Sequence, residues 1–264
     1  DQTFAYPNPG PDAAGVVTDK QVIVNSGFDS RGNAAKTERK RYDPETKDLI
    51  DIQETTNLLF DARRNVLSQV VETKDADGVL IDKVEVTNSG FDSRGNAGKV
   101  TRLSYDDKGK LLDKQVQINE KFDSRRNLLS QTVETYDDKG VLLETQKCAN
   151  SGFNSRGNPA KTERLSYDAG GKLIDKQVVE NNKYDARGNV LDQVTTTYDD
   201  KGAVLDKEVV KNTGFNSRGN PAHSERIRYD AAGTVMEKRV IDTTKFDKRG
   251  NVLEQTGKTY DDKG

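Results

Sequence analysis

The chain has a single cysteine, a single histidine and no tryptophan among its 264 residues. The lone Cys148 cannot form an internal disulfide, so cysteine content does not indicate a redox compartment. Together with His223 it provides too few ligands or nucleophiles for the usual zinc, cysteine–histidine or two-histidine sites. We therefore predict no catalytic residue, no metal ligand and no cofactor, with His223 at the surface and Cys148 acting as a small buried apolar residue.

Apolar residues and net charge are also scarce. Hydrophobic residues make up 32% of the chain and the mean hydropathy is -0.89, which excludes a thick hydrophobic core. The net charge is -2, so the chain as a whole has no field that would attract nucleic acid. No apolar run reaches the roughly 18 residues of a membrane span, and no leader of charged and then apolar residues opens the chain. We expect neither nucleic-acid binding nor membrane insertion.

What the sequence does contain is an internal repeat of an aromatic residue followed by Asp or Asn. These aromatic residues are 14 and 17 positions apart in alternation, with one spacing of 18 and with Lys74 in one slot. A Ser/Thr-Gly-Phe block recurs at larger intervals of 63, 62 and 62, ending at Phe28, Phe91, Phe153 and Phe215. The domain prediction is an extended arm over 1–10 and an array over 11–264 with superrepeats of about 62 residues.

Asp-x-x-Gly follows nearly every aromatic residue, as in YDDKG at 136–140. Asp favours the first position of a type I turn, and Gly tolerates the positive φ at the fourth position. Two copies, at 60–65 and 122–127, carry Arg in place of this Gly. Their turns must accept a left-handed arginine or adopt another form.

Segments of about 10 and 13 residues rich in Val, Thr, Leu and Gln separate the turns. Their composition favours strands, and frequent Gly and Pro disfavour helices. The fold class predicted is all-β: a tandem antiparallel array of about sixteen hairpin strands, a meander forming an elongated solenoid-like or spiral-like sheet.

Side-chain pairing suggests a register for the hairpins. A four-residue loop sets Leu165 opposite Ile174, Arg164 opposite Asp175 and Glu163 opposite Lys176, whereas a three-residue loop sets Arg164 against Lys176. Opposite charges across a strand pair stabilise by about 0.2–1 kcal/mol, and like charges destabilise. We therefore expect the four-residue loop.

Unequal strand lengths leave about three residues per longer strand unpaired, and we expect them at 88–90, 119–121, 181–183 and 243–245. One rim of the sheet would then carry loose polar backbone, where a ligand could bind. Paired turn carboxylates such as Asp106 and Asp107 suggest calcium, but two carboxylates fall short of the about six to eight oxygens that Ca²⁺ takes.

The pattern Tyr-Asp-x-x-Gly-x-Leu, as in YDDKGKLL at 105–112 and YDARGNVL at 184–191, resembles the YD repeats of bacterial RHS proteins and teneurins. The resemblance covers nearly all of 12–264. It implies long antiparallel sheets on secreted or surface proteins, which in that family spiral into a shell that sometimes encloses a toxin domain. It also implies an extracellular or cell-surface location, on a bacterium.

We interpret the chain as a noncatalytic extracellular structural repeat protein, a surface fibre or filament subunit. The alternatives are an adhesin module that binds glycan or calcium and a part of an RHS-like encapsulating shell. The array starts and stops at the same point of its pattern, so either the natural chain continues or copies join end to end. The residues predicted to make this head-to-tail contact are Phe4, Tyr6, Gln255 and Tyr260, through strand pairing or packing of the arm.

Overall fold

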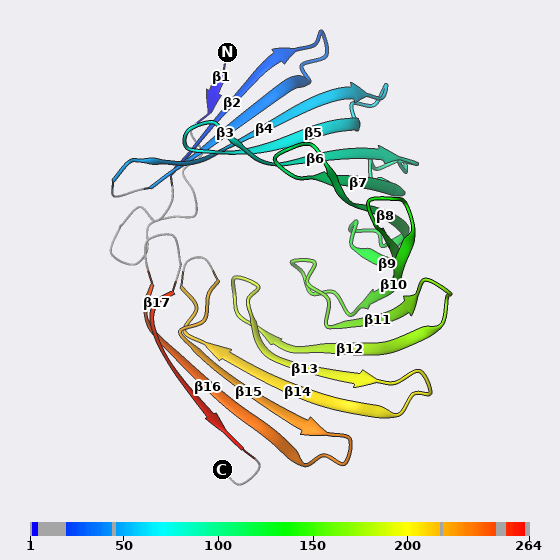
Figure 1. Ribbon diagram of the computed structural model, residues 1–264, viewed down its shortest axis with the longest axis vertical. Helices are drawn as coiled ribbons and strands as arrows, with labels where there is room; N and C mark the ends of the chain where they lie inside the picture. The colour runs from blue at the N-terminus through cyan, green and yellow to red at the C-terminus, as the bar shows by residue number, and fades with distance from the viewer. Residues whose placement is uncertain (1, 5–19, 44–45, 217–218, 247–251, 262–264) are drawn as a thin grey trace. The chain divides into compact units, whose positions relative to one another are not determined.

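A computed structural model describes residues 2–4, 20–43, 46–216, 219–246 and 252–261. All regular structure in these residues is β, and the strands follow one another as antiparallel hairpins, which confirms the predicted fold class (Figure 1). The strands are β1 (Gln2–Phe4), β2 (Lys20–Phe28), β3 (Ala34–Tyr42), β4 (Leu49–Phe60), β5 (Val66–Asp75), β6 (Leu80–Ser89), β7 (Lys99–Tyr105), β8 (Leu111–Phe122), β9 (Leu128–Tyr136), β10 (Leu142–Ser151), β11 (Lys161–Asp168), β12 (Leu173–Tyr184), β13 (Val190–Tyr198), β14 (Val204–Thr213), β15 (His223–Asp230), β16 (Val235–Phe246) and β17 (Val252–Tyr260).

The chain divides into two compact units. The first comprises Asp1–Asn119 and Val133–Leu143, and the second comprises Glu120–Thr132 and Glu144–Gly264. In the first unit, each strand from β1 to β8 pairs with the next one in sequence. In the second unit, the same holds from β10 to β17.

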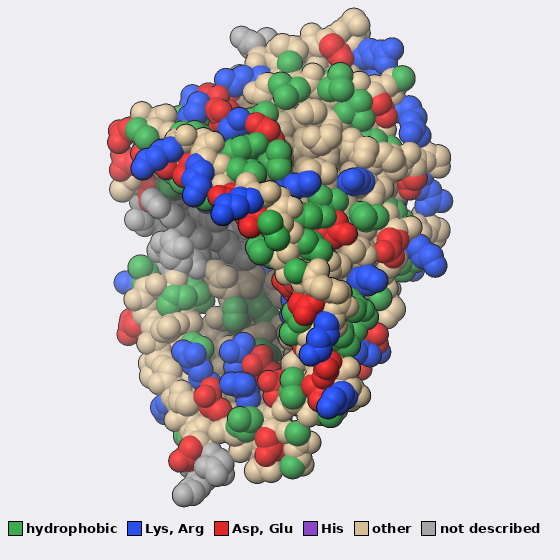
Figure 2. Space-filling view, turned by 45° about the vertical axis from the view of Figure 1, so that its right-hand side comes forward, with side chains coloured by type: hydrophobic (Ala, Val, Ile, Leu, Met, Phe, Trp, Pro, Cys, Tyr) green, Lys and Arg blue, Asp and Glu red, His purple; other side chains and the backbone are tan. Residues whose placement is uncertain are grey.

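The sheet is a single layer, so most side chains stay partly in contact with water. The buried residues of the described chain are two valines and three hydroxyl-bearing residues: Val116, Val178, Thr132, Ser166 and Thr243. Hydrophobic side chains lie between charged ones on the surface (Figure 2). Such an array depends on hydrogen bonds and on contacts between neighbouring strands more than on a core.

Hairpins of the pattern Tyr-Asp-x-x-Gly have a three-residue loop, whereas the β3–β4 hairpin, which lacks this Gly, closes one residue later, with Asp43 N–H donating to the Asp48 carbonyl at 2.8 Å. In the β11–β12 turn, Asp168 N–H donates to the Lys172 carbonyl at 2.9 Å and Gly171 N–H donates to the Asp168 carbonyl at 3.0 Å. Gly171 has a φ of 80°, as expected for a type I turn that ends in a left-handed residue. The predicted turn chemistry is confirmed, and Arg64 and Arg126 take the left-handed conformation at φ values of 71° and 72°.

The predicted register is wrong. Tyr167 pairs with Leu173 beside the turn, but the next pair is Ser166 with Asp175, so Ile174 is an extra residue in a β-bulge. The bulge shifts the rest of the hairpin and sets Arg164 opposite Gln177, to which it donates a hydrogen bond of 3.0 Å. Neither register considered from the sequence places this bulge, because both count loop residues alone.

The expected Glu–Lys pairs still meet across the bulged hairpins, but the expected pair of Arg164 with Asp175 does not form, since Asp175 lies opposite Ser166. Lys176 lies 3.6 Å from Glu163 although its direct partner is Leu165, and Lys238 lies 2.6 Å from Glu225. These ion pairs run diagonally between strands rather than straight across. Long Lys and Glu side chains reach a diagonal neighbour, so the charge pattern does not distinguish the two geometries.

Candidate functional site

Antiparallel pairing puts the turns of each unit at two opposite rims. Turns that follow even-numbered strands share the pattern Asp/Asn-x-Arg-Gly/Arg-Asn, and we call this edge the RGN rim; its fully described turns are 28–33, 60–65, 91–96, 122–127, 153–158 and 184–189. Turns that follow odd-numbered strands share the pattern Tyr-Asp-x-x-Gly, with Lys74 in the Tyr slot once. We call this edge the YD rim; its fully described turns are 74–79, 105–110, 136–141, 167–172, 198–203 and 229–234.

On the RGN rim, the turn aspartate is held by the asparagine that ends the turn. Asp61 Oδ1 accepts the backbone N–H groups of Arg63 and Asn65 at 2.8 Å each, and its Oδ2 accepts Asn65 Nδ2 at 2.8 Å. The side-chain hydrogen bond from Asn65, with the backbone bonds, lowers the pKa of Asp61 below its ordinary value. The same cause lowers the pKa of Asp185.

Successive turns of this rim also contact one another. A Cβ added to Gly95 would lie 2.8 Å from Asn65 Oδ1, and one added to Gly157 would lie 2.7 Å from Asn127 Oδ1. The same two turns are also joined by Arg63, whose guanidinium donates to the carbonyls of Asp92 at 2.9 Å and Phe91 at 3.3 Å in the following turn. The glycine therefore serves both its positive φ and the close approach of the preceding turn.

The arginine contact recurs along the rim. Arg31 donates to the Ala62 carbonyl at 3.0 Å, and Arg187 donates to the Phe215 carbonyl at 2.8 Å. Each of these guanidinium groups is exposed and uses one or two of its five N–H donors on the next turn. The rim thus carries a row of arginines whose positions are fixed by backbone acceptors.

A column of asparagines closes the strand ends beside this rim. Each one donates through Nδ2 to a carbonyl 22 or 23 residues earlier, at 2.9 to 3.3 Å, and every even-numbered strand from β4 to β14 supplies one donor: Asn57, Asn88, Asn119, Asn150, Asn181 and Asn212. Sequence reasoning placed loose backbone here, and register shifts do occur at Asn181/Lys183 and Thr243/Lys245. It missed the asparagine column, although the constant interval between these asparagines, half of the superrepeat, was a signal that could have revealed it.

The YD rim displays a row of exposed apolar side chains. Its members are between 50% and 52% exposed and recur at the same interval as the asparagines, with three in each unit: Ile81, Leu112, Leu143, Ile174, Leu205 and Met236. Five of them are the extra residue of a β-bulge, as for Ile174, because the partner strand has one residue fewer. Beside the row, lysines lie over tyrosine rings of the next strand, with Lys114 Nζ 4.9 Å from the Tyr136 centroid.

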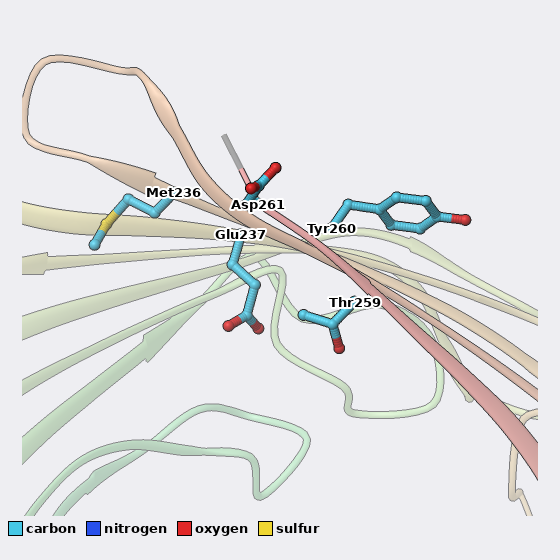
Figure 3. A pocket seen from close by; sticks show the side chains of 5 residues that line it. All are labelled: Met236, Glu237, Thr259, Tyr260 and Asp261. Carbon is cyan, nitrogen blue, oxygen red and sulfur yellow. The ribbon is translucent and has the colours of Figure 1, made fainter. Parts of the chain in front are cut away.

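A shallow pocket lies where β16 begins and β17 ends, at the YD rim. Met236 and Glu237 of β16 and Thr259, Tyr260 and Asp261 at the end of β17 line it. Figure 3 shows Met236 and Tyr260 on one side of the paired strands β16 and β17, with Glu237 and Thr259 directed to the other side. Met236, the last of the six residues of the apolar row, thus forms part of the pocket wall.

The four predicted assembly residues fall in different places. Phe4 lies in β1 and pairs with Ile23 of β2, whereas Tyr6 lies outside the described residues. Gln255 is an exposed residue of β17 opposite Thr243, and Tyr260 is half-buried opposite Lys238. Within one chain the arm segment thus adds to its own first strand, and a contact with another copy stays a prediction.

The residues considered for chemistry lie in ordinary strand positions. His223 Nδ1 is 2.6 Å from Asp242 Oδ1 of the paired strand at the surface, and Cys148 is half-buried rather than buried as expected. In the part of the chain that the structure describes, no group of three or more His, Cys, Asp or Glu side chains could hold a metal ion. The same residues include no helix long and apolar enough to cross a membrane.

No protein-family model matches the chain, and no curated protein matches it. Among solved structures, the chain is similar to a Tc holotoxin pore of Photorhabdus luminescens carrying a TccC3 mutation, at 14% identity and a TM-score of 0.21, over 94% of this chain and 14% of that chain. It is also similar to the TcdB2–TccC3–Cdc42 and TcdB2–TccC3–TEV structures, at 13% and 14% identity and TM-scores of 0.17, over 85% of this chain and 17% of those chains. The chain therefore spans a small part of each of these longer chains.

Proposed function

We propose that this chain is a noncatalytic structural repeat protein that works outside the cell as a surface fibre or filament subunit. The observation that carries this proposal is the asparagine column, in which one side-chain contact recurs six times, once for every pair of strands. A catalytic centre needs a unique arrangement of groups with different environments. A recurring contact instead gives each copy the same environment, which suits a structural protein that spans a distance by repeating one unit. The extracellular location rests on the resemblance to YD repeats.

The turn carboxylates support the same role. Asp106 Oδ1 accepts the N–H groups of Lys108 and Lys110 at 2.9 and 2.8 Å, and Asp137 Oδ1 accepts those of Lys139 and Val141 at 2.9 and 2.8 Å. These bonds engage Oδ1 of each aspartate in fixing its own turn, which is a structural role for the carboxylate.

Self-association is the second part of the proposal. Val252–Thr259 of β17 are all exposed, whereas the corresponding residues of β5, β9 and β13 are half-buried or buried. Among the described residues of its own unit, β17 pairs with β16, and it shares the alternation of those interior strands, so its second edge offers the position of a further strand. We assign that position to a strand or arm of another copy, with Gln255 and Tyr260 on one side of the contact and Phe4 and Tyr6 on the other.

Sedimentation velocity over a range of concentrations and negative-stain microscopy test the association. We expect filaments or short rods that lengthen with concentration, because a head-to-tail contact that does not close gives an open polymer. Leu253→Lys puts a charge on the exposed β17 strand and should weaken association. Leu205→Lys is the matched control, since Leu253 and Leu205 are 57% and 51% exposed and receive the same charge in different places.

A chain that stays monomeric at high concentration contradicts self-association, and equal effects of the two lysine substitutions contradict the β17 contact. Deleting residues 1–10 tests the arm separately, because assembly that persists without them removes Phe4 and Tyr6 from the contact. The noncatalytic assignment has its own test: a hydrolytic turnover that is abolished by His223→Ala would overturn it.

A further inference from the structure

At the Asp and Gly positions of the RGN-rim pattern, every exchange in the described turns adds positive charge or removes negative charge. Two of its turns replace Gly by Arg, at Arg64 and Arg126, and two replace Asp by Asn, at Asn154 and Asn216. Each exchange makes its turn more positive by one charge. The described turns contain no exchange that makes this rim more negative at these two positions.

These exchanges keep the turn geometry. Arg126 N–H donates to the Asp123 carbonyl at 3.1 Å, as Gly95 N–H does to Asp92 at 3.2 Å. Asn154 Oδ1 accepts the N–H groups of Arg156 and Asn158 at 2.9 and 3.0 Å, as an aspartate does in the sibling turns. A left-handed arginine is disfavoured relative to glycine by about 1 kcal/mol, so folding alone does not select Arg64 or Arg126. Strained residues that local structure does not require are a signal of function.

The row of arginines is preorganised for anions. Arg31, Arg63 and Arg187 are each anchored to a carbonyl of the next turn and remain exposed, and Arg187 Nε also lies 3.9 Å from Asp185 Oδ2. The N–H groups that these contacts do not use are available to carboxylate, sulfate or phosphate oxygens. The aspartates of the same turns direct their oxygens to N–H groups within the turn, as Asp61 does. The guanidinium groups therefore form the outward-facing charge of the rim.

The spacing of the row fits a linear polymer. Neighbouring turns of one rim are two strands apart, which is about 10 Å at the usual strand separation. A polysaccharide of two-sugar units with one acid group per unit repeats its charge at a similar interval. Nucleic acid fits less well, because single strands bind through bases stacked on a series of exposed aromatic rings. Beside these turns Phe28 is 47% exposed, whereas Phe60, Phe91 and Phe122 are half-buried.

We propose that the RGN rim of each unit binds a linear acidic polysaccharide, with the carboxylate or sulfate groups of the polysaccharide on successive arginines of that unit. The binding is distinct from self-association and does not depend on it. The test uses the full chain with two probes, heparin for sulfate and hyaluronate for one carboxylate per two-sugar unit, and measures affinity by interferometry over a range of salt concentrations. Neutral dextran and single-stranded oligothymidylate are the comparison ligands.

The sibling turns supply a variant that removes charge without disturbing the fold: Arg64→Gly, Arg126→Gly, Asn154→Asp and Asn216→Asp together. The matched control removes the same charge from the YD rim with residues found in its own siblings: Lys108→Ala, Lys139→Ala, Lys201→Ala and Lys110→Val. We expect the RGN variant to bind the acidic probe at least about tenfold more weakly, with a shallower salt dependence, and the YD variant to bind within about threefold of the parent chain. Urea unfolding verifies that both variants remain folded.

Several outcomes would overturn the proposal. They are a parent chain that binds neither acidic probe, an RGN variant that binds as the parent does, and a YD variant that loses as much affinity. Binding of neutral dextran would remove the role of charge. Binding of oligothymidylate as tight as that of the acidic glycans would replace the polysaccharide by nucleic acid as the ligand. Loss of self-association in the RGN variant, with glycan affinity intact, would make the rim a contact between copies.

Discussion

At the scale of single residues, the array is built from a few side chains that each make two contacts. Asn65 holds Asp61 of its own turn through Nδ2 and also presents Oδ1 to Gly95 of the next turn. Asn150 donates to the Leu128 carbonyl at 3.1 Å and accepts from Thr162 Oγ1 at 2.8 Å. Side chains with both a donor and an acceptor can link neighbouring hairpins in this way without a hydrophobic core.

The hydrogen-bonded carboxylates of the RGN rim should make part of the free energy of unfolding depend on acid pH. The pKa values of Asp61 and Asp185 are lowered from 3.8 by hydrogen bonds from Asn65 and Asn189, so the folded state holds these protons less tightly than the unfolded state. Their contribution is therefore complete above the unfolded pKa and is lost as the pH falls through the lowered folded value. We expect the urea midpoint to fall below about pH 4, measured by circular dichroism between about pH 6 and pH 2.

Sibling turns again provide the controls for this pH dependence. Asp61→Asn with Asp185→Asn copies the turn that Asn154 already forms and should make the fall shallower. Asn154→Asp adds a carboxylate in the same geometry and should make it steeper. Identical profiles for the three proteins would mean that the rim carboxylates do not determine the acid limb.

At the scale of elements, the strands are joined by the asparagine column where their lengths differ. Asn181 donates through Nδ2 to the Pro159 carbonyl at 3.0 Å, accepts from Gln193 Nε2 at 2.8 Å, and its N–H donates to the Ala160 carbonyl at 2.8 Å. One residue thus joins β12, β13 and the segment before β11 beside a bulge. The bulge that pattern analysis treated as a loose ligand loop is a hydrogen-bonded junction.

Replacing Asn181 should therefore cost more stability than replacing its neighbour. Asn181→Ala removes one of the two donors to the Pro159 carbonyl, which keeps the Tyr184 hydroxyl at 2.6 Å, and it also removes the acceptor of Gln193 Nε2. We expect a loss of about 1–2 kcal/mol in the free energy of unfolding. Asn182→Ala removes an exposed amide that donates to Asp192 at 3.0 Å, and we expect a loss below about 0.5 kcal/mol. Urea unfolding followed by circular dichroism measures both, and equal losses would show that the column does not hold the strands together.

At the scale of the whole molecule, each unit is a series of hairpins in which the described part of each strand pairs with its nearest neighbours in the series. Stability in such arrays is close to a sum over repeats and their interfaces. The structural period is one pair of strands, half of the superrepeat read from the Ser/Thr-Gly-Phe blocks, because the asparagine column and the apolar row recur at every hairpin of a rim.

Removing one complete period should leave the fold intact. Deletion of residues 175–205 joins Ile174 to Asp206, which occupies the same place in the pattern as Asp175. We expect an unchanged far-ultraviolet spectrum per residue and a urea m-value reduced in proportion to the lost residues. Deletion of residues 175–190 removes a shorter piece but places turns of the two rims out of phase. It should lower both the β content and the urea midpoint, and equal behaviour of the two deletions would contradict the two-strand unit.

The sequence by itself determined the strands, the turns and the left-handed positions, because these depend on hydrogen bonds between residues two to four apart, as between Asp168 and Lys172. It also indicated the ion pair between Glu163 and Lys176. Only the tertiary structure decided the register, since a bulge at Ile174 changes every later pair and weak cross-strand contacts of about 0.2–1 kcal/mol do not specify it. The asparagine column and the linked arginines likewise needed the folded sheet, because each joins residues more than 20 positions apart that only correct strand pairing brings together.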